Sequence, residues 1–238
     1  MEAAGIREHG TKFAQIFHAG GLSLLLNTQA RTILKTVLFT IAWTAAVAYG
    51  TGRLLTYESA PGRIGATPSE WPAASRIQRA TDRATLVMLA HPLCPCTRAS
   101  IDKLAKIMAR IQGKVSAYVV FLKPQGSGAD WENTGLRRTA AEIPGVMVLS
   151  DVDGAEAQRF GVETSGHTVL FDGGGHLLFS GGITESRGHS GDNAGERAIV
   201  SLVNNHAAER TRTFVFGCSL FNHNKIQTAG QYFKCKAN

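Results

Sequence analysis

Apolar and polar positions divide the chain into an uncharged apolar stretch, a polar connection and a region of short alternating elements. Residues 36–52 carry no charge, and as a helix they would rise about 25 Å, close to the roughly 30 Å hydrocarbon core of a bilayer. Apolar residues on both sides lengthen the stretch, so the pattern predicts one transmembrane helix over residues 36–55. A cleaved signal peptide and a buried helix of a soluble protein remain as alternatives.

The orientation of this span depends on the cationic residues near it. Arg31 and Lys35 before the span balance Arg53 and Arg63 after it. The tail over residues 1–35 contains further cations, and long C-terminal domains cross membranes largely regardless of charge. We therefore expect a single-pass inner (plasma) membrane protein with a cytoplasmic N-terminus and a periplasmic or extracytoplasmic domain.

The rest of the chain reads as a linker followed by a regular domain. Residues 56–83 are rich in Pro and Gly and poor in apolar residues, which is typical of a linker. Continuous apolar runs predict strands buried on both faces at 84–90, 115–122, 146–149, 168–171 and 177–180. Stretches with apolar residues every three or four positions predict helices at 97–112, 131–142, 155–160 and 193–209.

The order of these elements indicates the fold class. The early strands alternate with helices and imply parallel crossovers, whereas the glycine-rich turn at 172–175 joins the last two strands as an antiparallel hairpin. The sequence therefore predicts an α/β domain over residues 84–209, with a mixed central sheet and helices on both faces. A basic C-terminal tail with two cysteines follows at 210–238. Lys103, Lys106 and Arg110 are expected on the solvated face of helix 97–112.

Composition and charge restrict the partners. The chain has a net charge of +7, which taken alone suggests a polyanionic partner. Divided along the chain, the net charge is +2 over 1–35, +2 over 36–83, −1 over 84–208 and +4 over 209–238. The basic residues thus lie in the tails and the linker, near the expected membrane, where anionic lipid headgroups are the natural counterpart. We expect no nucleic-acid partner for the domain.

The most distinctive motif lies between the first strand and the first helix, where residues 91–97 read HPLCPCT. Pro95 suits the first position of a helix, which makes Cys94 the N-cap. The sulfur of an N-cap cysteine faces unsatisfied backbone N–H groups and the positive end of the helix dipole. Both effects favour the thiolate, the form that attacks disulfides and binds metal ions.

A Cys-Pro-Cys at this strand-to-helix turn, in this element order, resembles the thioredoxin fold, and most closely the membrane-anchored thioredoxin-like proteins of bacterial envelopes. The stretches HPLCPCTRAS, TSGHTVLFD and SGGITESRGHSGDN are also similar to thioredoxin-like proteins labelled RedB. The resemblance covers residues 84 to about 209. It implies a thiol–disulfide oxidoreductase, with no cofactor, that acts on protein thiols or disulfides of the cell envelope.

The resemblance also implies roles for individual residues. Cys94 matches the attacking cysteine of the family and Cys96 the resolving one, although one residue instead of two separates them here. His167 stands where the family has a cis-proline opposite the cysteines, either as a packing substitute or as a ligand or proton shuttle. Secondary candidates for the site are His189, Arg187 and His91.

Two other functions remain open. A disulfide within Cys-x-Cys closes a small ring, so a soft metal ion is an alternative occupant of the pair. Cys94, Cys96 and His167 would then bind Cu(I) in a copper chaperone. A thioredoxin-fold adaptor without chemistry is the third possibility. In the tail, Cys218 is expected either to pair with Cys235 or to reach the site as a third thiol.

Overall fold

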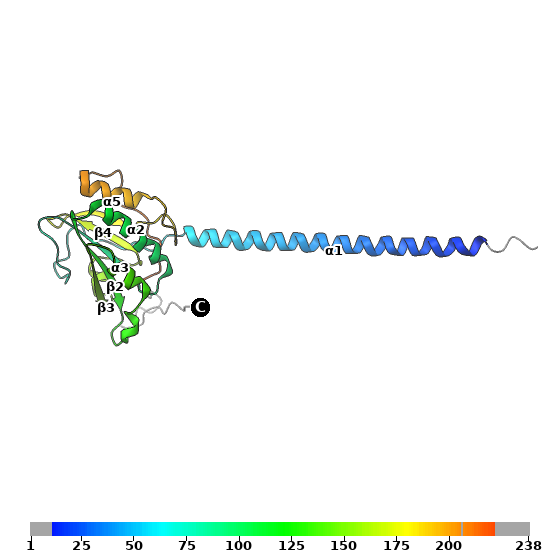
Figure 1. Cartoon of the computed structure of the whole chain (residues 1–238), viewed down its shortest axis with the longest axis horizontal. Coiled ribbons are helices and arrows are strands. Elements are labelled where there is room, and N and C mark those ends of the chain that lie inside the picture. The colour runs from blue at the N-terminus through cyan, green and yellow to red at the C-terminus, as the bar shows by residue number, and fades with distance from the viewer. Residues whose placement is uncertain (1–10, 206, 222–238) are drawn as a thin grey trace, which may run out of the picture. The chain divides into compact units, whose positions relative to one another are not determined.

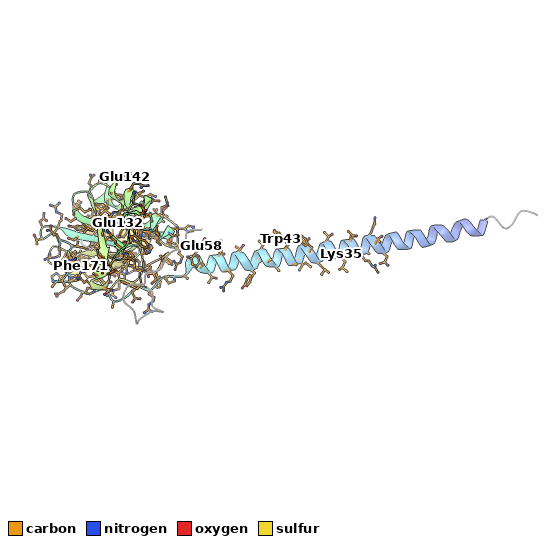
Figure 2. The ribbon with its side chains drawn as sticks, turned by 90° about the horizontal axis from the view of Figure 1, so that it is seen from below. Lys35, Trp43, Glu58, Glu132, Glu142 and Phe171 are labelled. Carbon is orange, nitrogen blue, oxygen red and sulfur yellow. The ribbon has the colours of Figure 1, made fainter. Side chains whose placement is uncertain are left out.

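The computed structural model describes residues 11–205 and 207–221, and the chain divides into two compact units that meet between Leu55 and Thr56. Most of helix α1 (Thr11–Ser59) lies in the first unit and forms one unbroken helix (Figure 1). Within it, Asn27–Ser59 is long and apolar enough to cross a membrane. Large apolar side chains project from this helix without cover, and Trp43, labelled in Figure 2, is 63% exposed.

Threonines recur along α1 every four residues and bond to the helix itself. The hydroxyls of Thr32, Thr36, Thr40 and Thr44 each donate to the carbonyl oxygen four residues earlier, at 2.8–3.0 Å. A hydroxyl that is satisfied in this way needs no water. The threonine side chains can therefore lie in apolar surroundings. The exposed Leu, Ile, Phe and Trp side chains of α1 favour the same surroundings.

The second unit is built on a five-stranded sheet with the strand order β3-β2-β1-β4-β5. Its strands are β1 (Ala84–Ala90), β2 (Val115–Lys123), β3 (Val146–Val152), β4 (His167–Phe171) and β5 (Leu177–Gly181). The first three strands are parallel, and β4 and β5 run antiparallel to their neighbours. The predicted mixed sheet is confirmed, and every predicted strand is present within a few residues of its expected bounds.

Helices cover both faces of this sheet, and Figure 1 labels the three that share one face, α2, α3 and α5. They are α2 (Pro95–Ile111), α3 (Gly135–Ala141), α4 (Ala155–Arg159) and α5 (Ala194–Asn205), with a short 3-10 turn at Ala129–Trp131. Leu86 and Met88 of β1 point into a core with α2, α3 and α5. Val87 and Leu89, which alternate with them, point into a second core with residues of α4. The predicted α/β class with helices on both faces is therefore confirmed.

Residues 60–83 differ from the linker that their composition predicts, because they pack on the second core. Ile77 is buried, and the Trp71 ring lies edge-on against Phe160 and Phe171 at 5.1 and 5.2 Å between centroids. The backbone N–H of Trp71 also donates to the carbonyl of Gly175. A few large apolar side chains fix this segment, although Pro and Gly dominate its composition.

The last helix begins one residue later than predicted and ends earlier. Asn193 is its cap: the Asn193 Oδ1 accepts the Glu196 N–H at 2.9 Å, and the Asp192 side chain is exposed. The Asn193 amide also donates to the carbonyl of Ile183, so the cap holds α5 to the loop after β5. Residues 207–209 lie outside the helix.

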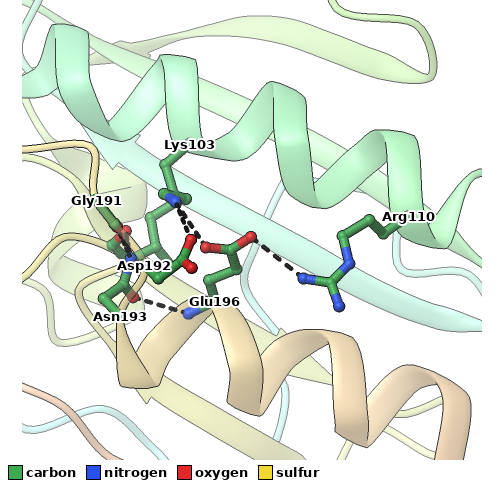
Figure 3. Close-up of polar contacts among 7 residues, drawn as sticks. Lys103, Arg110, Gly191, Asp192, Asn193 and Glu196 are labelled. Carbon is green, nitrogen blue, oxygen red and sulfur yellow. Dashed lines mark hydrogen bonds and ion pairs between the residues drawn. The ribbon is translucent and has the colours of Figure 1, made fainter.

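Lys103 departs from the expected solvated face, because α5 packs over that side of α2. Its side chain is 1% exposed, and its Nζ contacts the Glu196 Oε2 at 2.6 Å and the Asp192 Oδ1 at 3.9 Å. Figure 3 shows Glu196 between Lys103 and Arg110, with α2 above and α5 below. Helical periodicity predicted this charged face correctly, and Lys106 and Arg110 are exposed as expected, whereas Lys103 is buried against the carboxylate of Glu196.

Candidate active site

Cys94 lies at the start of α2, where the chain turns from β1 into the helix. It is the N-cap, with extended backbone angles (φ −83°, ψ 113°), and Pro95 follows as the first helical residue. The Cys94 N–H donates to the carbonyl of His91, and the Cys94 carbonyl accepts the Thr97 N–H, both at 3.1 Å. The predicted N-cap position of Cys94 is confirmed, and its side chain is fully buried.

The side chain of Cys218, which follows the last helix in the sequence, contacts that of Cys94. The two Sγ atoms are 3.1 Å apart, and the thiols share a hydrogen bond across a sequence separation of 124 residues. Cys96, 8% exposed, lies in the same group, because its thiol also interacts with those of Cys94 and Cys218. None of these three described cysteines is in a disulfide, and Cys235 lies outside the described residues.

Cys218 belongs to residues 211–221, which we call the C-terminal segment. This segment first runs beside β5, where the Ser180 N–H donates to the Thr211 carbonyl at 3.0 Å, and then crosses to the turn before β4. There the Ser165 N–H donates to the Cys218 carbonyl and the Leu220 N–H to the Glu163 carbonyl, both at 2.8 Å. Backbone pairing therefore holds Cys218 beside Cys94.

The approach at this turn is close enough to require glycine. A Cβ at Gly217 would lie 1.9 Å from the Ser165 carbonyl oxygen, which no side chain permits. On the other side of Cys218, Leu220 is buried in the second core. The C-terminal segment is thus part of the domain, whereas the sequence predicts a basic tail.

Buried hydroxyls connect this turn to the start of α2. The Ser165 Oγ lies 2.6 Å from the Thr97 Oγ1 and accepts the His91 N–H at 2.7 Å. All three residues are almost completely buried. Because these bonds join the end of β1, the first turn of α2 and the turn before β4, they fix the positions of Cys94 and Cys218 relative to each other.

The thiols differ in their acidity. Hydrogen bonds from Cys218 and Cys96 lower the pKa of Cys94 far below its ordinary value; burial opposes this shift and a bond from Thr97 supports it. For Cys96 the hydrogen bond with Cys218 acts to lower the pKa, but Cys94 and burial together raise it above the ordinary value. These directions favour Cys94 over Cys96 as the thiolate, in agreement with its place at the helix N-terminus.

Arg187, a secondary candidate from the sequence, does reach the site. Its Nη1 donates to the Gly217 carbonyl at 2.5 Å, its Nε donates to the Tyr57 carbonyl at 3.1 Å, and the guanidinium lies 4.9 Å from the centroid of the Tyr57 ring. A hydrogen bond from Arg187 also acts to lower the pKa of Cys96. Arg187 places a fixed positive charge beside the thiols.

The three candidate histidines have different positions. His91 borders the site: its Nδ1 accepts the Leu93 N–H at 3.1 Å, and its ring lies edge-on to Trp131. His189 is exposed, and its Nδ1 lies 3.2 Å from the Arg187 carbonyl. His91 thus helps to form the turn before Cys94, and His189 is two residues along the chain from a side chain that reaches the site.

His167 is the candidate that the fold keeps apart from the thiols. It pairs with Leu89 in the sheet, so its side chain points to the face of the second core. Its Nε2 lies 2.8 Å from the Ser180 Oγ, and burial lowers its pKa to about 4, a shift that the backbone of Ile64 opposes. The peptide bond before His167 is trans, as are all those in the described residues.

The metal site proposed from Cys94, Cys96 and His167 is not supported by this geometry. Across residues 11–205 and 207–221, no group of three or more His, Cys, Asp or Glu side chains is arranged to hold a metal ion. The physical reason is the sheet register, which turns the imidazole of His167 away from α2 toward Ser180.

Comparisons with known proteins find similar solved structures of low sequence identity. No family model and no curated protein matches the chain. A hypothetical protein from Sinorhizobium meliloti is similar over 68% of this chain and 96% of its own, at 16% identity and a TM-score of 0.48. An uncharacterized conserved protein from Geobacillus kaustophilus is similar over 68% and 91%, at 15% identity and a TM-score of 0.48.

A secreted disulfide oxidoreductase from Mycobacterium tuberculosis, homologous to E. coli DsbE, is similar over 51% of this chain and 81% of its own, at 13% identity and a TM-score of 0.36. The strand order, the antiparallel β4–β5 hairpin and the Cys-Pro-Cys at the start of α2 carry the fold assignment. The chain contains a thioredoxin-like domain. Its Cys-x-Cys pair lies between β1 and α2, as the resemblance implies.

Sequence reasoning left Cys218 between two alternatives and overlooked Ser165 and Thr97. Cys218 follows the last predicted helix in a stretch whose charge suggested a tail, so only tertiary contacts could bring it to the site. The short apolar run at 214–216, which Gly217 separates from Cys218, predicts an added strand; the structure forms isolated bridges at Arg212 and Ser219 instead.

Proposed function

We propose that this protein is a membrane-tethered thiol–disulfide oxidoreductase in which Cys94 is the attacking thiolate. The observation that carries the proposal is the Cys94 thiol, buried at the N-terminus of α2 with Cys218 3.1 Å away and Cys96 in the same group. A thiolate with a second thiol in reach is the requirement for exchange through a mixed disulfide.

The surroundings of Cys94 fit this chemistry. The unsatisfied N–H groups of the first turn of α2 and the helix dipole stabilise negative charge, and hydrogen bonds from neighbouring thiols add to that effect. Arg187 supplies a positive charge next to the thiols. After the first attack, a second thiol must release the partner; Cys218 lies 3.1 Å from Cys94, and Cys96 is two residues along the chain in α2.

The proposal includes the membrane location. Helix α1 would span the inner (plasma) membrane with residues 1–35 in the cytoplasm, and the domain would act on protein thiols or disulfides on the extracytoplasmic side. The exposed apolar side chains of α1 and its self-bonded threonines support a lipid environment. The resemblance to proteins labelled RedB belongs to this proposal and depends on the three quoted stretches.

Thiol–disulfide exchange by the full-length protein in detergent tests the activity. Wild type is expected to reduce insulin disulfides or to oxidise a reduced model peptide, and Cys94→Ser to lose both activities. A wild-type chain that does neither, and whose thiols stay unmodified in redox buffers of every potential, would leave only the adaptor function.

Reconstituted vesicles of known orientation test the location. A membrane-impermeant thiol reagent is expected to label the unfolded domain only from the side opposite the N-terminus. Labelling from the N-terminal side would contradict the tether. Loss of the first 50 or so residues from the membrane-bound protein would also contradict it, because that loss matches cleavage of a segment of signal-peptide type.

A further inference from the structure

Two thiols can complete the exchange that Cys94 begins, and their attachment to the chain differs. Cys96 is two residues from Cys94 in the first turn of the same helix, with Pro95 between them. Although the two thiols interact, only Pro95 separates them along the backbone, and its ring fixes the φ angle within the small ring that a disulfide would close. A bond between Cys94 and Cys96 would therefore deform the start of α2.

Cys218 reaches Cys94 without that constraint. It lies on the C-terminal segment, and its Sγ is 3.1 Å from the Cys94 Sγ. A disulfide is about 2.05 Å long, so the two sulfurs need to approach by about 1 Å. The backbone pairing of Cys218 with Ser165 and the close contact of Gly217 with the same turn hold the segment in place for this approach.

We propose that Cys218 is the resolving thiol of the site and that Cys94 and Cys218 form the disulfide of the oxidised protein. The proposal rests on the thiol–disulfide function proposed above. In the first step the Cys94 thiolate attacks one sulfur of a partner's disulfide; that bond breaks, a Cys94–partner disulfide forms, and the partner's other sulfur leaves as a thiolate.

In the second step the Cys218 sulfur, as its thiolate, attacks the Cys94 Sγ. The Cys94–Cys218 bond forms, the mixed disulfide breaks and the partner's second sulfur leaves as a thiolate, which solvent protonates. Cys94 and Cys218 together lose two electrons and two protons, and the partner disulfide gains both. A dithiol protein or a small thiol reduces the pair by the reverse steps, in which the same disulfide acts as an oxidant.

The burial of Cys94 gives the C-terminal segment a second role. Because the Cys94 side chain is fully buried with Cys218 against it, the proposed exchange also requires the C-terminal segment to move aside while a partner disulfide reacts. The return of this segment then brings Cys218 to the mixed disulfide, guided by the antiparallel contact of Thr164 with Ser219. Access and resolution are coupled because one segment controls both.

Disulfide mapping of the full-length protein tests the pairing. The protein is oxidised in glutathione buffer, its remaining thiols are alkylated and its peptides are assigned by mass spectrometry. We expect a Cys94–Cys218 bond in the wild type, in Cys96→Ser and in Cys235→Ser. A Cys94–Cys96 or a Cys218–Cys235 bond as the main product in wild type would overturn the proposal.

Trapping of the mixed disulfide tests the kinetic role. Cys218→Ser and Cys218→Ala are expected to accumulate the Cys94–partner species at least about tenfold over wild type, because the release step is lost. Cys96→Ser, which keeps Cys94 and Cys218, is the comparison variant and is expected to release the partner rather than to accumulate this species. Accumulation in Cys96→Ser with none in the Cys218 variants would assign resolution to Cys96.

The two proposals can fail separately. If the Cys94–Cys218 bond forms but the wild type exchanges with no protein disulfide or dithiol, the oxidoreductase function is wrong and with it the resolving role. If turnover depends on Cys94 but mapping shows Cys94–Cys96, the function stands and the role of Cys218 is wrong. Because Cys96→Ser keeps both proposed partners, the mapping test holds even if a Cys218 variant misfolds.

Discussion

Helix α2 is joined to later parts of the chain at two buried points, and the two contacts use different chemistry. Lys103 meets Glu196 across 93 positions, with 2.6 Å between Nζ and Oε2. Cys94 meets Cys218 across 124 positions, with 3.1 Å between the sulfurs. The first contact pairs two opposite charges, and the second pairs two groups that share a proton and can form a covalent bond.

The difference shows how position on a helix decides what a buried polar group can do. Lys103 lies inside α2, where the backbone N–H groups are already bonded, so its charge needs the carboxylate of Glu196. Cys94 is the N-cap of α2, where the N–H groups of the first turn have no intrahelical partner and stabilise a thiolate. The ion pair holds α2 against α5, and the thiol pair is the contact on which the proposed exchange depends.

Among changes at these two contacts, loss of the attacking sulfur of Cys94 is expected to have the largest effect, and the effect is on turnover. In Cys94→Ser, turnover of a protein disulfide should fall at least about 1,000-fold, because a hydroxyl does not replace a thiolate as the nucleophile. The midpoint of thermal unfolding should change little, because serine fits the N-cap position well. Insulin reduction by the full-length protein and a melting curve of the same sample measure both quantities.

The control for this prediction is a variant of the ion pair between Lys103 and Glu196. Lys103→Met combined with Glu196→Leu removes both charges and is expected to leave turnover per folded molecule within about twofold of wild type. A turnover loss as large as that of Cys94→Ser would mean that the ion pair, too, belongs to the chemistry of the site.

Removing one charge of the ion pair is expected to have the next largest effect, on stability. Glu196→Ala leaves the Lys103 ammonium buried with only the exposed Asp192 nearby, which should lower the free energy of unfolding by about 3–5 kcal/mol. The double variant described above should lose much less, since apolar side chains of similar volume need no partner. Urea unfolding followed by circular dichroism distinguishes the two; equal losses would contradict the argument.

His167 provides a prediction about pH. Its folded pKa, about 4, lies below the ordinary 6.5 because of burial, so the unfolded chain takes up a proton first as the pH falls. The stability is complete above pH 6.5 or so and decreases through the window down to about pH 4, by about 3 kcal/mol for this group. His167→Gln should lack this part of the pH dependence, measured as unfolding free energy against pH.

The same variant separates His167 from the thiol site. If the imidazole only packs against Ser180, turnover of His167→Gln at pH 7 should remain within about twofold of wild type. A large loss of turnover without a change in the pH dependence of stability would restore the proton-shuttle role. His176→Gln, at a side chain that is 69% exposed, is the matched control and should leave turnover unchanged.

Particular residues show what the sequence can and cannot predict here. The strands and the N-cap position of Cys94 follow from local patterns, namely apolar runs and Pro95 at the first helical position. The burial of Lys103, the place of Cys218 and the direction of His167 depend on which distant segments pack together. Helix α5 covers Lys103, the C-terminal segment brings Cys218, and the register of β4 turns His167 away.

The smallest expected effect is on the acidity of Cys94. Thr97→Val removes a hydrogen bond that helps to lower the pKa of that thiol, so the pH midpoint of the attack should rise by less than about one unit, whereas Thr97→Ser should keep it. Thr97 also bonds Ser165, which pairs with Cys218. If Thr97→Val slows turnover with no shift in the midpoint, the hydroxyl acts by positioning the C-terminal segment, and the reactivity of Cys94 then depends on that contact more than on the helix end.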